Sequence, residues 1–462
     1  MIIIVMFVDR EKELSKLLEI SESKKAELIL IYGRRRVGKS RLLVEFKNRM
    51  KKTKNSLYFL ADTSKNILDI LSSQIKDEFV KFTTWEDFFD FICRSKYEII
   101  IIDEFQYLYQ VNKAWPTMLQ RWWEKIKETN KKIILCGSII STIYKISKGY
   151  GSALYGRKTY EMQITPLKFK SIKNFLKHYN FENLIKAYAI VGGIPRYLEE
   201  FDSNLDVEEN IRKKIVDKNA FLYNEPTNLL FEEFRDPTQY ISIILAITQG
   251  YTKFNEIATM SKIEGHKLPK YLLVLERINI IEKEVSVTEK KIKTKTTRYN
   301  IKDNFYRFWF RFIFRNKSMI ELGLENEVFS TIKKELNSYI GRRFEDLCKE
   351  SFVPAEIFTF TKVGRWWHKD KEIDIVALNE KTKQILFGEC KWKSNANAKK
   401  ILSELREKSK YVDWNNEKRK EYFVIFAKSF KNKKKFEKET KKRKENVFLF
   451  DLKDIKKILK RY

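Results

Sequence analysis

The sequence predicts an α/β protein that opens with a parallel sheet and closes with a second, smaller α/β domain. Three observations lead to this fold class. Apolar runs alternate with helical patterns in the first part of the chain, a glycine-rich loop joins an early strand to a helix, and alternating strands return near the end. The 462 residues allow about two to four domains, and we expect them at residues 1–200, 201–315 and 325–462.

The first strand and helix flank a phosphate-binding loop. Leu28–Ile31 is apolar, residues 33–40 have the pattern G-x-x-x-x-G-K-S, and a helical pattern follows. The glycines let backbone N–H groups surround phosphates, and we expect Lys39 to reach the β- and γ-phosphates of ATP and the Ser40 hydroxyl to bind Mg²⁺. The arginines of the loop either sense the nucleotide or brace the loop. The residues predicted to contact ATP are Gly33, Arg34, Arg35, Arg36, Val37, Gly38, Lys39, Ser40 and Arg41.

Polar residues follow two further apolar strands. Asp103 and Glu104 come after residues 98–102, and open α/β sheets place ligands at this end of a strand. Asp103 is expected to hold the Mg²⁺ shell through water, and Glu104 to polarise the attacking water as a general base. Ser138 follows residues 132–137, and it either senses the γ-phosphate and positions water or caps the next helix. Arg157 is the candidate arginine finger, acting in its own chain or on a neighbouring subunit, and a surface arginine is the alternative.

The middle of the chain has the element order of a winged helix. Helices are expected at residues 239–247, 254–260 and 267–277, and a hairpin at 280–287 and 297–301. The third helix would offer Lys267, Lys270 and Arg277 to a DNA groove, and the basic tip at 289–298 would follow phosphates. A packing or oligomerisation module is the alternative, because fold alone does not fix function. The aromatic stretch 304–314 is expected to form a buried connector helix.

The last domain carries a second set of acids. Glu345 lies in a helix, Asp374 in the strand at 372–378, and Glu389 and Lys391 in the strand at 384–392. Two acids on neighbouring strands can share one divalent ion, and side chains two residues apart on a strand face the same side. We expect Glu345, Asp374 and Glu389 to bind Mg²⁺, and Asp374, Glu389 and Lys391 to be catalytic. The lysine run at 430–444 is either a solvated helix face or a phosphate grip.

Charge and composition favour a nucleic-acid partner in the cytoplasm. The net charge of +31 suits DNA. The four cysteines form no C-x-x-C pair, so neither zinc nor a disulfide framework is predicted, which fits a reducing compartment. The apolar opening at residues 1–7 is too short to span a membrane and has no basic leader, and we expect a soluble protein without a membrane partner.

The motifs of the first domain resemble those of the archaeal AAA+/STAND-type ATPases. They are Phe7-Val-Asp-Arg-Glu, the phosphate loop, Ile-Asp-Glu-Phe-Gln, Cys-Gly-Ser, Leu-Tyr-Gly-Arg and Gly192-Gly-Ile-Pro-Arg-Tyr197. The resemblance implies an ASCE P-loop core with strand order 5-1-4-3-2, a small helical lid and ATP hydrolysis. A homo-oligomer is a further expectation.

The acids of the last domain resemble those of the PD-(D/E)xK nuclease superfamily, which has a restriction-endonuclease-like fold. The resemblance rests on the ordered set of Glu345 in a helix, Asp374 in a strand, and Glu389 and Lys391 in the next strand. It implies Mg²⁺-dependent phosphodiester cleavage. The alternative is a STAND-like nucleotide switch, in which the last domain binds nucleic acid or protein partners without cleaving.

Overall fold

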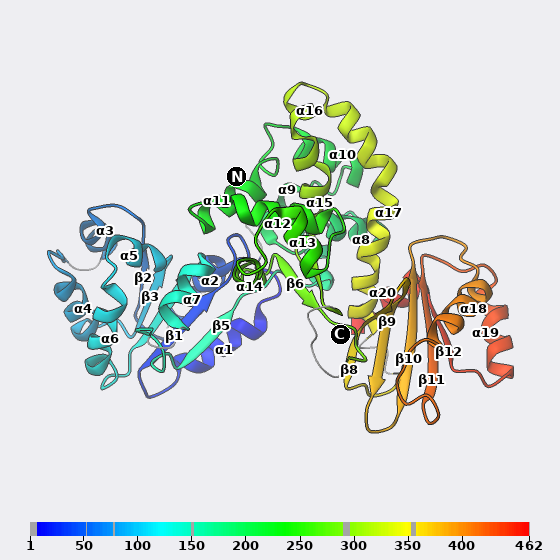
Figure 1. Cartoon of the computed structure of the whole chain (residues 1–462). Helices are drawn as coiled ribbons and strands as arrows, with labels where there is room; N and C mark the ends of the chain where they lie inside the picture. Colours follow the sequence, from blue (N-terminus) through cyan, green and yellow to red (C-terminus); the bar gives the residue numbers. More distant parts are fainter. Residues whose placement is uncertain are drawn as a thin grey trace. The chain divides into compact units, whose positions relative to one another are not determined.

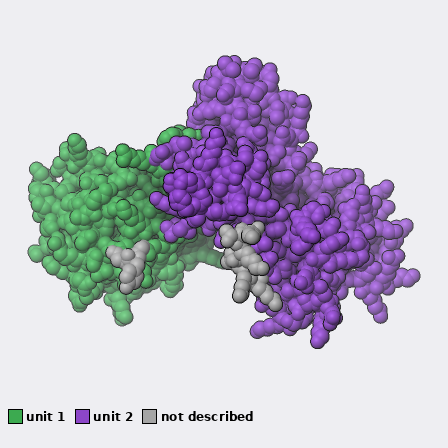
Figure 2. All heavy atoms as spheres, in the orientation of Figure 1, with its two compact units in different colours: residues 1–167, 194–196, 227–235 green, residues 168–193, 197–226, 236–462 purple. Residues whose placement is uncertain are grey.

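The chain forms two compact units (Figure 2). The computed structural model describes residues 7–51, 53–76, 79–148, 152–289, 296–352 and 357–461. Unit 1 comprises residues 1–167, 194–196 and 227–235, and unit 2 comprises residues 168–193, 197–226 and 236–462. Most of the apolar opening (residues 1–6) and most of the basic hairpin tip (290–295) lie outside the described residues. The division into three domains is finer than these two units and stays a prediction.

Unit 1 is built on a parallel five-stranded sheet (Figure 1). The strands lie in the order β2-β3-β4-β1-β5, which is the expected order 5-1-4-3-2 counted from the other edge, so that prediction is confirmed. The elements are α1 (Glu11–Ser21), β1 (Glu27–Tyr32), α2 (Lys39–Met50), β2 (Ser56–Leu60), α3 (Ile67–Ser73), α4 (Trp85–Arg94), β3 (Ile99–Asp103), α5 (Gln106–Val111), α6 (Trp115–Ile126), β4 (Lys132–Gly137), α7 (Ile140–Ser147) and β5 (Tyr160–Gln163).

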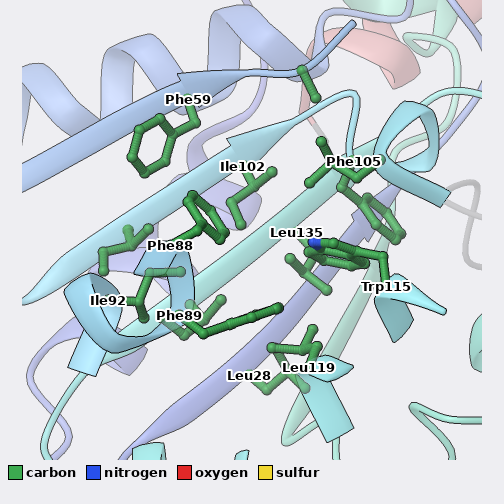
Figure 3. Close-up of a cluster of buried hydrophobic side chains, with 14 of the residues drawn as sticks. Leu28, Phe59, Phe88, Phe89, Ile92, Ile102, Phe105, Trp115, Leu119 and Leu135 are labelled. Carbon is green, nitrogen blue, oxygen red and sulfur yellow. The ribbon is translucent and has the colours of Figure 1, made fainter. Parts of the chain in front are cut away.

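Apolar side chains cover both faces of this sheet. Alternate residues of β1 point to opposite faces, so Leu28 and Leu30 join one core and Ile29 and Ile31 join the other. The first core is rich in aromatic rings from α4 and α6, which pack on β3 and β4 (Figure 3). The second core is formed with α1 and α2. A sheet buried on both faces in this way leaves the carboxyl ends of its strands to carry polar side chains.

The first half of unit 2 is helical. The three helices and the antiparallel hairpin expected in the middle of the chain are present as α12, α13, α14, β6 and β7. The aromatic stretch forms α15, whose rings are buried, and the indole N–H of Trp309 donates to the carbonyl oxygen of Tyr223 at 2.6 Å. The elements are η1 (Phe169–Asn174), α8 (Phe181–Val191), α9 (Pro195–Glu200), α10 (Val207–Ile211), η2 (Arg212–Val216), α12 (Thr238–Thr248), α13 (Phe254–Ser261), α14 (Leu268–Arg277), β6 (Ile281–Glu284), β7 (Arg298–Ile301), α15 (Asn304–Phe312), η4 (Phe314–Asn316) and α16 (Lys317–Glu321). Helix α11 (Glu225–Glu233) lies mostly in the segment 227–235 of unit 1.

The second half of unit 2 is a mixed five-stranded sheet in the order β12-β11-β10-β9-β8. Strand β9 is antiparallel to both β8 and β10, and β10, β11 and β12 run parallel. The apolar side of α18 joins one core of the sheet, and rings of Phe344 on α17 and Trp392 meet on the other face, 5.1 Å apart. The elements are α17 (Glu325–Phe352), β8 (Lys362–His368), β9 (Lys371–Asn379), β10 (Gln384–Lys391), α18 (Ala398–Ser409), β11 (Lys420–Ala427), α19 (Lys433–Lys442), β12 (Val447–Phe450) and α20 (Leu452–Arg461).

The hairpin is attached to the edge of this sheet. The backbone N–H of Val287, just after β6, donates to the carbonyl oxygen of Arg365 on β8 at 3.0 Å. Arg298 on β7 pairs with Glu372 on β9 at 3.2 Å. The base of the hairpin is therefore part of the surroundings of the last domain's acids. Among the described residues, no helix has the length and apolar character needed to cross a membrane.

Candidate nucleotide site and candidate acidic site

The loop between β1 and α2 has the backbone of an anion-binding turn. Arg36 and Gly38 both have positive φ, 68° and 95°, so the chain reverses before α2 begins. Lys39 is 4% exposed, and its ammonium group donates to the carbonyl oxygens of Gly33 and Arg34 at 2.9 and 3.0 Å. The lysine thus lies across the inside of the loop, where the oxygens of a phosphate chain could replace these two acceptors.

Asp103 ends β3 and is completely buried. Its Oδ2 accepts a hydrogen bond from the Tyr58 hydroxyl at 2.6 Å, and its Oδ1 accepts one from the backbone N–H of Glu104 at 2.9 Å. Tyr58 is also hydrogen-bonded to Ser40, so this tyrosine joins the two residues predicted to serve Mg²⁺ in the nucleotide site. Burial, followed by the charge of Asp103, raises the pKa of Tyr58, and the phenol stays protonated.

Glu104 and Ser138 meet beside Asp103, as the sequence predicts for the ends of two neighbouring strands. The Ser138 hydroxyl donates to Oε2 of Glu104 at 2.5 Å, and the Gln106 amide donates to the same oxygen. The backbone N–H of Ser138 donates to Oε1 of Gln106 at 3.2 Å. The other interpretation of Ser138, a helix cap, is wrong, because α7 begins after Ile139 and has no side-chain cap from that position.

The arginines of the loop are braced by residues from elsewhere in unit 1. Arg35 pairs with Glu232 at 2.9 Å and donates to the Tyr107 hydroxyl. Arg10 donates to the carbonyl oxygen of Val37 at 3.1 Å and so holds the loop from outside. Of the remaining loop residues, Arg34 is buried and Arg41 is exposed. For Arg35, then, the bracing interpretation agrees with the observed contacts.

The segment 227–235 also supports the end of β4. The Glu233 carboxylate accepts hydrogen bonds from the backbone N–H groups of Ser141 at 2.7 Å and Ile140 at 3.3 Å, at the start of α7. A carboxylate at this position satisfies N–H groups that no helix can satisfy internally, and it complements the helix dipole. Burial raises the pKa of Glu233.

Arg157 lies away from the phosphate loop of its own chain. It precedes β5, which runs parallel to β1 with Tyr160 beside Ile29 and Gln163 beside Tyr32. The phosphate loop follows Tyr32 at the carboxyl end of β1, whereas Arg157 lies before the amino end of β5, at the opposite ends of these parallel strands. There it donates to the carbonyl oxygen of Tyr155 at 3.4 Å. This placement does not fit an arginine finger in the same chain. A role on a neighbouring subunit stays a prediction.

The acids of the last domain converge as expected. Asp374 on β9 accepts a hydrogen bond from the backbone N–H of Cys390 on β10 at 2.8 Å, which places it beside Glu389. Lys391 donates to Oε1 of Glu389 at 2.7 Å. Burial, followed by the charge of Glu389, raises the pKa of Asp374 to about 6. Burial alone would lower the pKa of Lys391, but the neighbouring Glu389 raises it overall, so the lysine stays charged.

Glu345 approaches this group from α17. Burial, followed by the charge of Asp374, raises the pKa of Glu345 to about 8. The Arg365 guanidinium on β8 donates to Glu345 and also lies 3.6 Å from Glu372 and 3.9 Å from Glu284. Burial opposes the charge on Arg365, but the surrounding carboxylates, Glu345 first, raise its pKa overall. Arg365 therefore holds a group of acids together.

Glu345 and Asp374 line a polar cavity of about 540 Å³, here called the acidic pocket. One wall comes from the last domain, with Glu345, Arg365 and Asp374, and the other comes from the α12–α13 loop and the hairpin, with Lys253 and Arg298. Within the described ranges, no three His, Cys, Asp or Glu side chains have the arrangement of a metal site. The carboxyl groups of Glu345 and Asp374, which line the pocket, both have a raised pKa. Carboxylate oxygens suit a Mg²⁺ ion that keeps several of its waters.

Four residues of the two sites were missed in the sequence. Tyr58 and Arg365 lie in strands whose patterns give no sign of a role. Gln106 is the first residue of α5, and Lys408 lies on the amphipathic helix α18. Lys408 binds both oxygens of Glu389 at 3.0 Å. The only usable signal was the position of Gln106 two residues after Glu104.

The fold and the loop define the class of protein. A phosphate loop between β1 and α2, acids at the end of β3 and a parallel sheet are the parts of a P-loop ATPase. A family described as "ATPase domain predominantly from Archaea" matches residues 7–201, and one described as "Archaea bacterial proteins of unknown function" matches residues 309–401. The chain therefore carries an archaeal ATPase domain followed by the second of these domains.

Relatives identify the family of the whole chain. The uncharacterized protein MJECL04 of Methanocaldococcus jannaschii is 37% identical over 462 residues, covering 97% of this chain and 100% of that protein. The chain belongs to the family of this protein. The uncharacterized ATP-binding protein MJ0423 of the same organism is 46% identical over 55 residues, 12% of this chain and 93% of that protein. The Walker-type ATPase PABY2304 of Pyrococcus abyssi has a similar fold, with a TM-score of 0.50 and 22% identity over 66% of this chain and 96% of that one.

Proposed function

We propose that the chain hydrolyses ATP at the phosphate loop, binds DNA, and cleaves phosphodiester bonds at the acidic pocket with Mg²⁺. The convergence of Asp374, Glu389 and Lys391, of which Asp374 lines the open acidic pocket, carries the proposal of cleavage. In this proposal the last domain is a PD-(D/E)xK-like nuclease, and unit 1 is a motor or switch that controls it.

The nucleotide site has a residue for each task in hydrolysis. Lys39 and the loop N–H groups bind the phosphates of ATP. Ser40 and Asp103 would hold Mg²⁺, since both meet at the Tyr58 hydroxyl. Glu104 is the general base, and Ser138 fixes one oxygen of its carboxylate at 2.5 Å. The second oxygen, Oε1, has no hydrogen-bond partner among the residues that the structure describes, so it can accept a proton from water.

Charge and fold support DNA as the partner. The net charge is +31, and Lys267, Lys270 and Arg277 of α14 are exposed. In the proposal α12, α13, α14 and the β6–β7 hairpin act as a winged helix, with α14 against a groove. The lysine run forms α19, where Lys434, Lys435, Lys438 and Lys441 are exposed, as either a solvated face or a phosphate grip requires.

The acidic pocket fits phosphodiester chemistry. Asp374 and Glu389 would hold Mg²⁺, with Glu345 nearby, because the raised pKa of Asp374 shows a carboxylate that a cation would relieve. Bound Mg²⁺ lowers the pKa of water and polarises phosphate oxygens. Lys391 stays protonated, so its task is to hold the attacking water and offset the charge that develops on the phosphate.

Two lysine variants test the two activities separately. We expect Lys39→Ala to abolish ATP hydrolysis and Lys391→Ala to abolish cleavage of DNA, each leaving folding intact by circular dichroism. ATP turnover and nicking of linear, branched and single-stranded DNA with Mg²⁺ are the measurements. Lys47→Ala on α2 and Lys399→Ala on α18 are matched controls that touch neither site. Unchanged ATP turnover in Lys39→Ala would refute the role of the loop, and unchanged nicking in Lys391→Ala would refute that of the pocket.

One observation favours a second function, a STAND-like switch whose last domain binds without cleaving. Lys391 and Lys408 both pair with Glu389, at 2.7 and 3.0 Å, and so neutralise a proposed metal ligand. An active ATPase that nicks none of these DNA substrates would select this alternative.

A further inference from the structure

A second cavity lies beside the acidic pocket and is lined by four arginines. It has a volume of about 100 Å³, and we call it the arginine cavity. Arg307 and Arg311 come from α15, and Arg342 and Arg343 come from α17. Of the residues that the structure describes, no acidic one lines it. Gathering four guanidinium groups around one small space is unfavourable unless an anion fills it, since like charges repel and buried charges need partners.

The ion pairs of these arginines leave an excess of positive charge. Arg311 pairs with Glu335 at 2.6 Å, and Arg343 pairs with Asp346 at 2.7 Å. Neither carboxylate lines the cavity. Among the described residues, Arg307 and Arg342 have no carboxylate partner. Four positive charges against two negative ones leave about two charges for a ligand to balance.

Unused donors also point to an anion. The side chain of Arg343 is 7% exposed, and its Nε–H is buried with no hydrogen-bond acceptor. The Nε–H of Arg307 is also buried without a hydrogen-bond acceptor, although a terminal nitrogen of the same guanidinium donates to the carbonyl oxygen of Ile301. An unmade hydrogen bond of a buried charged donor is expensive. A phosphate group offers several oxygens at once, and guanidinium groups bind phosphate through paired N–H donors.

The two cavities share part of their lining. Arg342, Gly250, Thr252 and Asn300 line both the arginine cavity and the acidic pocket. A ligand with more than one phosphate could therefore occupy both, one phosphate at the arginines and another near Asp374. A nucleic-acid strand is such a ligand, and this step rests on the proposed function.

We infer that the arginine cavity is a phosphate-binding site that takes a backbone phosphate of a nucleic acid next to the one in the acidic pocket. Arg311 and Arg342 suit a test, because Arg342 is exposed and unpaired and Arg311 lines the arginine cavity but not the acidic pocket. The half-exposed pair of Arg311 with Glu335 contributes about 1 kcal/mol or less, so its loss leaves the fold intact. Lys334→Gln, also exposed on α17, removes the same charge outside both cavities.

The experiment measures binding of labelled duplex and single-stranded oligonucleotides to the full chain in EDTA, by fluorescence anisotropy over a range of salt concentrations. Each lost phosphate contact lowers the slope of log K against log[salt] by about 0.9 for duplex and about 0.7 for single strands. We expect this loss for Arg342→Gln and Arg311→Gln, near-normal slopes for Arg342→Lys, and no change for Lys334→Gln.

A second arm separates nucleic acid from free phosphate. Inorganic phosphate is added to the wild type and to Arg342→Gln, and the melting temperature is recorded. If phosphate stabilises only the wild type while all oligonucleotide slopes are equal, the cavity holds a free anion and the inference is overturned. Equal slopes without any phosphate effect overturn it as well. In both cases DNA binding itself stands, whereas a wild type that binds no oligonucleotide would sink the proposed function together with the inference.

Discussion

At the scale of single residues, Glu104 is the most constrained side chain of the nucleotide site. Its φ of 55° lies in the left-handed region, which costs about 1–3 kcal/mol for a residue with a Cβ. Ser138 and Gln106 then fix one carboxylate oxygen. The ends of β3 and β4 and the start of α5 hold Glu104 in this conformation, because they bring these three side chains together. Its orientation is thus set before any nucleotide arrives.

This arrangement makes a prediction for Glu104→Gln. The amide keeps the shape of the side chain but cannot take a proton, so ATP binding should persist while hydrolysis falls by about a hundredfold or more. Binding of a labelled ATP analogue and release of phosphate are the two measurements. Glu98→Gln, six residues earlier and just before β3, is the matched control and should leave both unchanged. Hydrolysis at the wild-type rate in Glu104→Gln would mean that another group is the base.

At the scale of elements, the contact between the ends of β1 and β5 depends on Gly33. The backbone N–H of Ile164 donates to Tyr32 at 2.7 Å, and a Cβ on Gly33 would lie 2.2 Å from the carbonyl oxygen of Ile164. That oxygen belongs to the backbone and cannot swing aside. The absence of a side chain at Gly33 therefore lets β5 close the sheet next to the phosphate loop.

We expect Gly33→Ala to separate β5 from β1 and to distort the loop. The variant should lose about 1–3 kcal/mol of stability, as overpacked sites do, and should bind ATP weakly or not at all. Urea unfolding and nucleotide binding measure the two effects. Gly265→Ala is the control, since a Cβ there meets open space. Wild-type stability and affinity in Gly33→Ala would show that the strands can move apart freely.

At the scale of the whole molecule, the acids of the last domain link stability to pH. The pKa of Glu345 rises from 4.5 to about 8, and that of Asp374 from 3.8 to about 6. The groups that face this pair are Arg365, Glu284, Asp346, Glu389 and Lys391. Between the unfolded and folded values the native state holds more protons than the unfolded chain. The contribution of the two protonated acids to the free energy of unfolding is therefore largest below about pH 4. It is lost as the pH rises through about 6, where Asp374 ionises, and then about 8, where Glu345 ionises.

The full chain in EDTA should therefore melt at a lower temperature at pH 8 than at pH 5. Added Mg²⁺ should reduce this fall, because a divalent ion favours the ionised carboxylates. Glu345→Gln should flatten the curve, whereas Glu327→Gln, at an exposed position near the start of α17, should retain it. Melting by circular dichroism across pH 5–8 makes the comparison. A wild-type melting temperature that rises steadily with pH would contradict the raised pKa of Glu345.

Much of the nucleotide site could be predicted because its signals are local. Gly33, Lys39 and Ser40 lie within one loop of fixed spacing, and Asp103 and Glu104 directly follow an apolar strand. The partners of these residues were not predictable, because hydrogen bonds such as Tyr58 to Asp103 join segments 45 residues apart. The same applies to the arginine cavity, whose four members lie in an aromatic helix and a charged one.

Strand β8 shows how irregular geometry hides an element. Its sequence, Lys-Val-Gly-Arg-Trp-Trp-His, has no alternation of apolar and polar residues, so the pattern does not predict a strand there. The structure has a shift in register between Gly364 and Trp366, so the regular period of two is broken there. Arg365 lies within this irregularity, which explains why a residue central to the acidic pocket gave no signal.

The discontinuous make-up of unit 1 has a consequence during protein synthesis. Residues 227–235 belong to this unit and provide Glu232 for Arg35 and Glu233 for the start of α7. A nascent chain therefore cannot complete the unit when residue 167 leaves the ribosome, and must wait until residue 235 has followed. At about 5–20 residues per second this wait lasts several seconds, during which the loop arginine lacks its carboxylate partner. Expression of residues 1–200 alone should accordingly give an incomplete ATPase unit.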